Sequence, residues 1–372
     1  MRQRMKCYKV AIRTIGPVFV GSGREIGKKE YVFLNRGKAG ILDIQKLYAE
    51  MHKRGIGSLF EDYLLGRDGA DLERWLKKRN IKVGEILKAV KYTVDCGDHI
   101  LETGGKQLHV MESIKDPYGK PYIPGSSLKG MFRTIFLGAE LMHSPQKYQK
   151  EKQDLLKNAG IKSSRTRYLK KEIGQLEAAA YRTLQRDKKK PESAVNDILQ
   201  GFVVSDSDPL SVEDLVLCQK VDLHAKGIER GLPILRECIK PDTRIDFTIT
   251  VDSEVCPLTE EKIFCAVKDF IGSYYKNFSS AFTGIRAPGE KDVFLGGGCG
   301  FVSKTVLYPL LGKPQGLEMA QKVFANTGVP ANHKHAHDRE YGASPHTLKC
   351  TKYHGKNFQM GLCRIEQLEC IG

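Results

Sequence analysis

The stretch Pro121-Tyr-Ile-Pro-Gly-Ser-Ser-Leu-Lys-Gly-Met-Phe-Arg133 carries the clearest structural signal in the chain. Its order predicts the end of a strand, a turn at Gly-Ser-Ser and then a helix with two basic residues near its start. Ser126 or Ser127 can cap that helix, and the free N–H groups of a helix N-terminus favour an anion such as phosphate. Lys129 and Arg133 are four residues apart, so they share one helix face. We therefore expect this segment to bind phosphate groups.

A second glycine-rich stretch, Phe294-Leu-Gly-Gly-Gly-Cys-Gly-Phe-Val-Ser-Lys-Thr305, lies near the other end of the chain. Neither stretch has the spacing of a nucleotide-binding loop. A Walker A loop needs Gly-x-x-x-x-Gly-Lys-Ser/Thr, whereas here Lys129 precedes the second glycine. The run from Gly296 to Phe301 lacks the third glycine of a dinucleotide fingerprint. Tight turns with positive φ are the structural alternative for both stretches.

Composition favours a soluble protein with polyanionic partners. The chain has 372 residues, enough for two domains, and carries a formal charge of +16 with an estimated pI of 9.3. No apolar run approaches the roughly 20 residues that span a bilayer, and the basic N-terminus leads into no signal-peptide core. We expect a cytoplasmic protein that does not contact the membrane.

The ten cysteines include no Cys-x-x-Cys pair, so the sequence contains neither a zinc ribbon nor a thioredoxin motif. Several lie in apolar segments, among them Cys218, Cys265, Cys299 and Cys363. We interpret these four as buried free thiols of a reducing compartment.

Hydrophobic patterning predicts an α+β fold. Strands are expected over residues 8–16, 31–34, 92–96, 106–114, 215–223, 232–239 and 244–251, with a further strand near Ala39. Asp43 is placed to cap a helix that starts at Ile44, and another helix is expected over residues 259–281. Helical spacing also covers residues 55–92.

The order strand, helix, paired strands, helix occurs roughly twice, which predicts two ferredoxin-like units that resemble RNA-recognition motifs, with antiparallel sheets plus helical insertions. We expect an N-terminal domain over residues 1–205, with helical insertions at about 55–92 and 144–196. The C-terminal domain, residues 206–372, contains the glycine-rich loop. The charged 144–196 segment is expected to be a solvated face rather than an RNA contact.

Several motifs, in this order along the chain, resemble the RAMP superfamily. They are Gly21-Ser-Gly23 with Asp43, Pro124–Arg133, Leu295–Thr305, Ser344–Lys352 and Gly361–Ile365. The last two resemble, within that superfamily, the fifth subunit of the Csm complex, a type III-A CRISPR effector. Two positions depart from the family pattern: the unbroken glycines at 296–298, where an aromatic residue often intervenes, and His346, where arginine is expected.

The resemblance implies a non-catalytic RNA-binding subunit that caps a filament of related subunits and contacts the 3′ region of the CRISPR RNA. It also implies a role in guide maturation and antiviral defence. Expected partners are the CRISPR RNA, a neighbouring RAMP backbone subunit and, indirectly, the target RNA. The residues that the resemblance assigns to RNA binding are Gly21, Ser22, Gly23, Lys28, Lys29, Ser126, Ser127, Lys129, Arg133, Gly297, Gly298, Gly300, Lys304 and Lys349.

Other functions are less well supported by the sequence. His333, His335 and His337 would share one face of a strand, or only His333 and His337 one face of a helix, and could hold zinc, but a polar loop flanked by glycine and proline is expected to be exposed. The carboxylates of residues 203–208 could bind Mg²⁺, but turn and cap hydrogen bonds by Asp206 and Ser207 are the simpler expectation.

We therefore predict no metal, no cofactor and no catalytic residue. The alternative is a RAMP endoribonuclease that processes or trims the guide RNA, with a base such as Glu25. A third possibility is an assembly protein that contacts RNA only incidentally.

Overall fold

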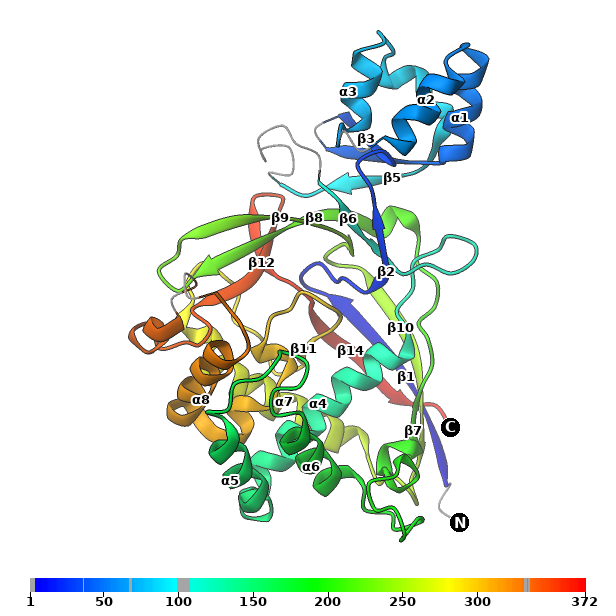
Figure 1. Ribbon diagram of the computed structural model, residues 1–372. Helices are drawn as coiled ribbons and strands as arrows, with labels where there is room; N and C mark the ends of the chain where they lie inside the picture. The colour runs from blue at the N-terminus through cyan, green and yellow to red at the C-terminus, as the bar shows by residue number, and fades with distance from the viewer. Residues whose placement is uncertain (1–3, 36, 67–68, 99–107, 331–332, 334) are drawn as a thin grey trace.

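A computed structural model describes residues 4–35, 37–66, 69–98, 108–330, 333 and 335–372. Within these residues the chain forms two curved β-sheets, a layer of helices against one of them, and a small helical unit at the far end of the other (Figure 1). In the described part of the chain, no helix has the length and apolar character needed to cross a membrane.

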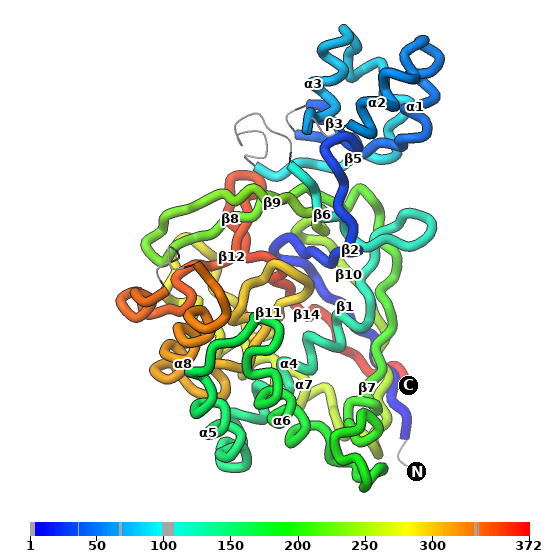
Figure 2. The backbone as a smooth tube through the Cα atoms, viewed as in Figure 1, coloured from blue at the N-terminus to red at the C-terminus, as the bar shows by residue number. Residues whose placement is uncertain are grey.

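The first sheet has five strands, all antiparallel to their neighbours. Its central strand pairs with a strand more than 200 residues away, from Met5↔Asp252 to Arg13↔Arg244. On the other side Tyr8 pairs with Cys370, so the two ends of the chain lie side by side (Figure 2). In sheet order the strands are β11 (Asp292–Phe294), β14 (Leu362–Cys370), β1 (Met5–Thr14), β10 (Arg244–Asp252) and β7 (Phe202–Val204).

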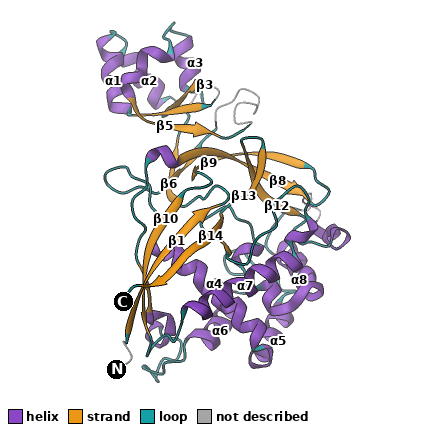
Figure 3. Ribbon diagram, turned by 180° about the vertical axis from the view of Figure 1, so that it is seen from behind, coloured by secondary structure: helices purple, strands orange, loops and turns teal. Residues whose placement is uncertain are grey.

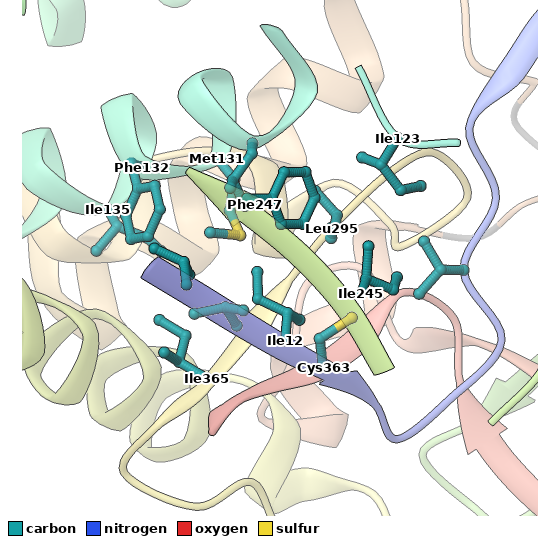
Figure 4. Close-up of a cluster of buried hydrophobic side chains, with 14 of the residues drawn as sticks. Ile12, Ile123, Met131, Phe132, Ile135, Ile245, Phe247, Leu295, Cys363 and Ile365 are labelled. Carbon is teal, nitrogen blue, oxygen red and sulfur yellow. The ribbon is translucent and has the colours of Figure 1, made fainter. Parts of the chain in front are cut away.

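Helices cover one face of this sheet and bury the main hydrophobic core (Figures 3 and 4). Figure 4 shows Met131 and Phe132 of a helix packed over Ile12 and Phe247 of the sheet, with Leu295 of the glycine-rich stretch in the same cluster. The covering helices are α4 (Gly125–His143), α7 (Glu260–Asn277) and α8 (Leu307–Asn326).

The helix expected over residues 259–281 is confirmed as α7 followed by the 3₁₀ turn η7 (Ser279–Ala281). Thr259 caps α7 by accepting a hydrogen bond from the Lys262 N–H.

The second sheet is mixed. Two of its pairs, β5 with β8 and β6 with β9, are parallel. The expectation of antiparallel sheets is therefore correct for the first sheet and wrong for the second, because local alternation does not reveal in which direction a distant strand runs. In sheet order the strands are β2 (Gly21–Ile26), β6 (Val110–Ser113), β9 (Glu229–Ile239), β8 (Leu215–His224), β5 (Val90–Cys96), β4 (Lys38–Leu42) and β3 (Tyr31–Asn35), with β12 (Thr347–Tyr353) on β8 and β13 (Lys356–Gln359) on β12.

The helical unit between β4 and β5 has a hydrophobic cluster of its own, centred on Phe60 and Trp75, whose rings meet edge to face. Asp43 caps its first helix, as expected, by accepting a hydrogen bond from the Lys46 N–H at 3.1 Å. This unit lies at the top of Figure 1, away from the main core. It contains α1 (Ile44–Lys53), α2 (Gly57–Leu65), α3 (Leu72–Lys77) and η1 (Val83–Ala89).

The insertion expected over residues 144–196 is helical in its first part only. The 3₁₀ turn η3 (Pro145–Tyr148) leads into α5 (Gln149–Asn158), and α6 (Lys170–Tyr181) follows. Residues 182–193 form turns and bends. Other short 3₁₀ turns are η4 (Ala194–Asn196), η5 (Ile198–Gly201), η6 (Val212–Asp214), η8 (Val302–Lys304) and η10 (His335–Tyr341).

Strands from both sides of residue 205 meet in each sheet. In the first sheet β1 lies between β14 and β10, and in the second β6 lies beside β9. A boundary at residue 205 therefore does not separate the two sheets, because their strand pairing joins segments far apart in the sequence.

Candidate nucleic-acid interface

The glycine-rich loop packs its backbone directly against the segment that precedes β2. The Gly297 N–H donates to the Phe19 carbonyl at 2.6 Å. Gly296 has φ +78°, and a Cβ added there would lie 2.3 Å from the same carbonyl oxygen. Both the backbone conformation and the close approach therefore require glycine at 296.

Two further glycines of the loop lie over basic side chains. Gly298 has φ +81°, and a Cβ there would lie 3.3 Å from Nη1 of Arg236. Gly300 has φ +96°, and a Cβ there would lie 3.2 Å from Cγ of Lys349. The turn interpretation and the binding interpretation of this loop are therefore compatible, because the same glycines make the turn and expose its backbone above two cations.

Arg236, on β9, is the residue of this site that sequence reasoning missed. Its guanidinium carbon lies 5.6 Å from the centre of the Phe19 ring. Nε and Nη1 are buried and have no hydrogen-bond partner within the described residues, nor does the guanidinium form an ion pair with any of them. The available signal was an Arg-Glu pair inside an otherwise apolar predicted strand. Arg236 as a whole is only partly buried, but burying two N–H groups of a cation without a hydrogen-bond partner is costly, so this geometry points to an anion that the protein binds.

The two lysines of this region are already engaged by the protein. Lys349 Nζ donates to both carboxylate oxygens of Asp222, at 2.8 and 2.9 Å. Lys304 Nζ lies 3.3 Å from the Phe294 carbonyl oxygen. The charge of Lys349 is therefore largely offset by Asp222, whereas that of Arg236 is not.

The early glycine loop borders the same region. Gly21, Ser22 and Gly23 are exposed on β2, and a Cβ added at Gly21 would lie 2.7 Å from the Phe19 ring. The ring of Phe19 therefore connects β2 to the glycine-rich loop. The sequence-predicted residues that the structure gathers around Phe19 and Arg236 are Gly21, Gly297 and Gly298, while Gly300, farther along the same loop, lies against Lys349.

Lys28 and Lys29 lie farther along the chain, where it enters the helical unit. Lys29 Nζ donates to the Tyr63 and Gly66 carbonyls and lies 4.7 Å from the centre of the Tyr63 ring. Lys29 therefore anchors α2. The Lys28 carbonyl accepts a hydrogen bond from the Leu72 N–H at 3.2 Å.

The start of α4 differs from the expected serine cap. Helix α4 begins at Gly125, and neither Ser126 nor Ser127 caps it; instead the Gly125 N–H donates to Asp206 Oδ1 at 2.8 Å. The expectation of a serine cap is wrong because a carboxylate from a distant segment occupies that position. The cap role expected for Asp206 is confirmed.

Lys129 and Arg133 share one helix face, as predicted, and that face is turned toward protein. Lys129 Nζ donates to the Leu199 carbonyl at 2.7 Å, and burial lowers the pKa of this lysine. Arg133 pairs with Asp197 at 2.7 Å and Glu177 at 3.2 Å. Burial, the largest single effect, lowers the pKa of Arg133, but the hydrogen bond to Asp197 and the charges of Asp197 and Glu177 together outweigh it, so the arginine pKa is raised. Phosphate binding by this pair stays a prediction, and it would compete with these contacts.

His333, His335 and His337 lie in and beside η10 rather than on a strand, and the expectation of exposure is confirmed for His333 and His337 and wrong for His335. His337 is exposed and lies 2.8 Å from Glu340, whereas His335 is largely buried against Asp338. The candidate base Glu25 is exposed on β2, with its Oε2 3.8 Å from Nδ1 of His109.

Comparison with known proteins defines the class of protein first. The sequence matches the family model of the RAMP superfamily over residues 11–303, and the chain belongs to that superfamily. Its curated relatives are proteins named CRISPR system Cms protein Csm5. The chain is 30% identical to the one from Mycobacterium tuberculosis H37Rv, over 98% of each chain. It is 28% identical to the one from Enterococcus italicus, over 86% of this chain and 84% of the relative.

Two solved structures share the fold. One is a chain of the cryo-EM structure of a Csm–crRNA–target RNA ternary complex in a type III-A CRISPR-Cas system, with TM-score 0.62 and 17% identity, covering 96% of this chain and 100% of that one. The other is the crystal structure of T. onnurineus Csm5, with TM-score 0.58 and 17% identity over 95% and 99% of the two chains.

Proposed function

We propose that this protein is a non-catalytic RNA-binding subunit of a type III-A CRISPR effector, which caps the subunit filament and holds the 3′ region of the CRISPR RNA. Its Csm5 relatives and the solved Csm–crRNA–target RNA complex support this proposal. The formal charge of +16 is suited to a polyanion. In this role the protein acts in the cytoplasm, in guide maturation and antiviral defence, beside a RAMP backbone subunit.

The observation that carries the proposal is the uncompensated guanidinium of Arg236 beneath the glycine-rich loop. An RNA phosphate that approached the loop would meet backbone without side chains, and the positive charge of Arg236 would attract it. Contacts of this kind position a strand and carry little sequence information. A subunit that holds guides of many sequences needs this property.

The topology of the first sheet also supports this function. Strand β1 is followed by α4 and β7, and β10 by α7 and β14, and the sheet order is β14-β1-β10-β7. We interpret this as a ferredoxin-like βαββαβ unit, the arrangement of RNA-recognition motifs. The second such unit is assigned to the mixed sheet and remains part of the proposal.

The proposal is tested by the binding of a fluorescent CRISPR RNA to the purified full chain at several salt concentrations. Replacing Arg236 with Ala should weaken binding about tenfold and lower the slope of log affinity against log salt by about one. The matched control is Arg79→Ala, which removes the same charge from a guanidinium that lies 3.9 Å from the Trp75 ring in the helical unit. Thermal melting of each variant separates loss of binding from loss of fold.

An unchanged affinity and salt slope in Arg236→Ala would contradict the placement of RNA at the glycine-rich loop. The same reactions, run on a denaturing gel, test the second candidate function. Intact RNA is the expected result. Cleavage that is lost when His109 or Glu25 is replaced would establish an endoribonuclease instead.

A further inference from the structure

Three side chains that could hold a metal converge beside the start of β12. Asp338, in η10, lies between two imidazoles: Nδ1 of His335 is 3.1 Å from Oδ2, and Nδ1 of His346 is 2.5 Å from Oδ1. One ligand atom from each of the three residues lies within 4.8 Å of the others. Within the part of the chain that the structure describes, this is the one group of His, Cys, Asp and Glu with such spacing.

The cluster is enclosed and held in place by its surroundings. The Asp338 side chain is fully buried, and those of His335 and His346 are 14% and 12% exposed. The Phe324 ring stacks on His335 with ring centres 4.1 Å apart. The Ser344 hydroxyl donates to Oδ2 of Asp338. Carboxylates that bind metals are commonly held in orientation by a hydrogen bond of this kind.

We propose that His335, Asp338 and His346 form a binding site for one divalent transition-metal ion, with Zn²⁺ as the ion that best suits the donors. Two imidazole nitrogens and a carboxylate oxygen are typical zinc ligands, whereas Mg²⁺ and Ca²⁺ favour oxygen alone. Ligand atoms of tetrahedral zinc lie about 3.4 Å apart, close to the 3.1 Å between His335 and Asp338, whereas the 2.5 Å between His346 and Asp338 must widen by about 0.9 Å to admit the ion. Water supplies the fourth ligand.

Binding of the ion changes the tautomer of both imidazoles. Without metal, each neutral imidazole can donate its Nδ1–H to the carboxylate; to hold the ion, each one exchanges that proton through solvent for one on Nε2, so that the Nδ1 lone pair faces the ion and no net proton is released. His224 is not part of the ligand set, although its ring centre lies 4.8 Å from that of His346. Its Nδ1 accepts a hydrogen bond from the Lys226 N–H.

An ion at this position would link η10 to the residue that precedes β12. Gln321 of α8 donates to the carbonyls of His335 and Ala336, so η10 is already tied to α8. His346 immediately precedes β12, which carries Lys349 beneath Gly300. The ion would therefore fix the edge of the glycine-rich loop, and its binding does not depend on the proposed RNA function.

The test uses the full chain without a polyhistidine tag, stripped with a chelator and then supplied with Zn²⁺ alone. After gel filtration, elemental analysis should find one zinc ion per chain, and competition with a chromophoric chelator gives the affinity. Replacing His335 or His346 with Ala should weaken binding about 100-fold. His337→Ala, which removes an exposed histidine two residues from His335, should bind as the unchanged protein does.

Co²⁺ serves as a spectroscopic probe of the same site. The chain with Co²⁺ should show the intense visible absorption of tetrahedral coordination, and this absorption should be absent from Asp338→Asn, a variant of the same shape. Thermal melting confirms that each variant is folded. Substoichiometric zinc in the unchanged protein, or equal zinc binding in the His335 and His346 variants, would overturn the proposal.

Discussion

At the scale of single residues, Gly125 and Gly130 of the motif at residues 121–133 differ in whether the structure requires glycine. A Cβ at Gly125 would lie 2.4 Å from the carbonyl oxygens of Val204 and Ser205, so the start of α4 can approach β7 only because the side chain is absent. Gly130 lies in the middle of the same helix on a solvent-exposed face, and a Cβ added there would meet no atom within 4 Å.

These two glycines give a paired prediction. Gly125→Ala should destabilise the protein by about 1–3 kcal/mol, because the helix must shift away from β7. Gly130→Ala should stabilise it by up to about 1 kcal/mol, because alanine loses less backbone entropy in a helix. Urea unfolding of both variants measures the two changes. A loss of stability in Gly130→Ala would show that its surroundings are more crowded than the structure has them.

The basic residues show that residue type alone does not determine whether a side chain contacts solvent or protein. Lys129 and Arg133 share a helix face, as their spacing requires, yet that face contacts Leu199 and Asp197. Arg236 belongs to none of the motifs recognised in the sequence, yet it lies under the glycine-rich loop. Spacing along a helix determines which side chains are neighbours, whereas the packing of that helix determines whether they meet solvent or protein.

At the scale of elements, a buried ion pair holds the junction of β9 and β6. The Glu237 side chain is fully buried and pairs with Lys115, which is 9% exposed. Glu237 also accepts hydrogen bonds from the Tyr92 hydroxyl at 2.8 Å and the Ser113 N–H at 3.1 Å. Three segments that are distant in the sequence therefore meet at one carboxylate.

Removing the charge of Glu237 should be costly. Glu237→Gln should destabilise the protein by about 3 kcal/mol, because it leaves the Lys115 ammonium, which is 9% exposed, with only the more distant Glu112 carboxylate, 3.5 Å away, as a counter-charge. The double variant Glu237→Gln/Lys115→Met should recover part of that loss. Chemical denaturation measures both values.

The control for this cycle is Glu318→Gln, which breaks an exposed pair with Lys322 and should leave the denaturation midpoint nearly unchanged, because solvent screens the pair. Equal effects at the buried and the exposed pair would contradict the role given to Glu237.

Local patterns predicted many of the elements. The strands expected over residues 215–223, 232–239 and 244–251 are confirmed as β8, β9 and β10, because each alternates or is continuously apolar. Segment α8, two helical pieces joined by a kink at Gly312 (φ +70°), was not anticipated, since its internal Gly312 and Pro314 are typical of helix breaks. The parallel pairs of the mixed sheet also escaped prediction, because direction is not encoded in local alternation.

At the scale of the whole molecule, the ten cysteines fall into three classes of solvent exposure. Cys265 and Cys370 are exposed, Cys7 and Cys96 are partly exposed, and the remaining six are buried. The interpretation of Cys218, Cys299 and Cys363 as buried free thiols is confirmed, and that of Cys265 is wrong because it lies on the outer face of α7. Burial raises the pKa of the Cys256 thiol to about 11 and that of Cys350 to about 12.

Thiol labelling should follow this order. Near pH 8 the folded protein should react rapidly at Cys370 and more slowly at Cys265, because the neighbouring Asp269 raises the pKa of the Cys265 thiol and so lowers its thiolate fraction. The six buried thiols should react only after denaturation. Mass spectrometry of peptides after timed alkylation measures each site, with Cys370→Ser as the control for the fast phase. Rapid labelling of Cys363 in the folded state would contradict the packing of the main core.

The sequence by itself determined the α+β class, many helices and strands, the cap at Asp43, the positive charge and the RAMP resemblance. These depend on neighbours within a few residues or on totals over the chain. Only the tertiary structure decided that β1 pairs with β10, that Arg236 lies beneath Gly298, and that His335, Asp338 and His346 converge. Such contacts join residues distant in sequence or placed together by packing, so they depend on strand register and burial rather than on local pattern.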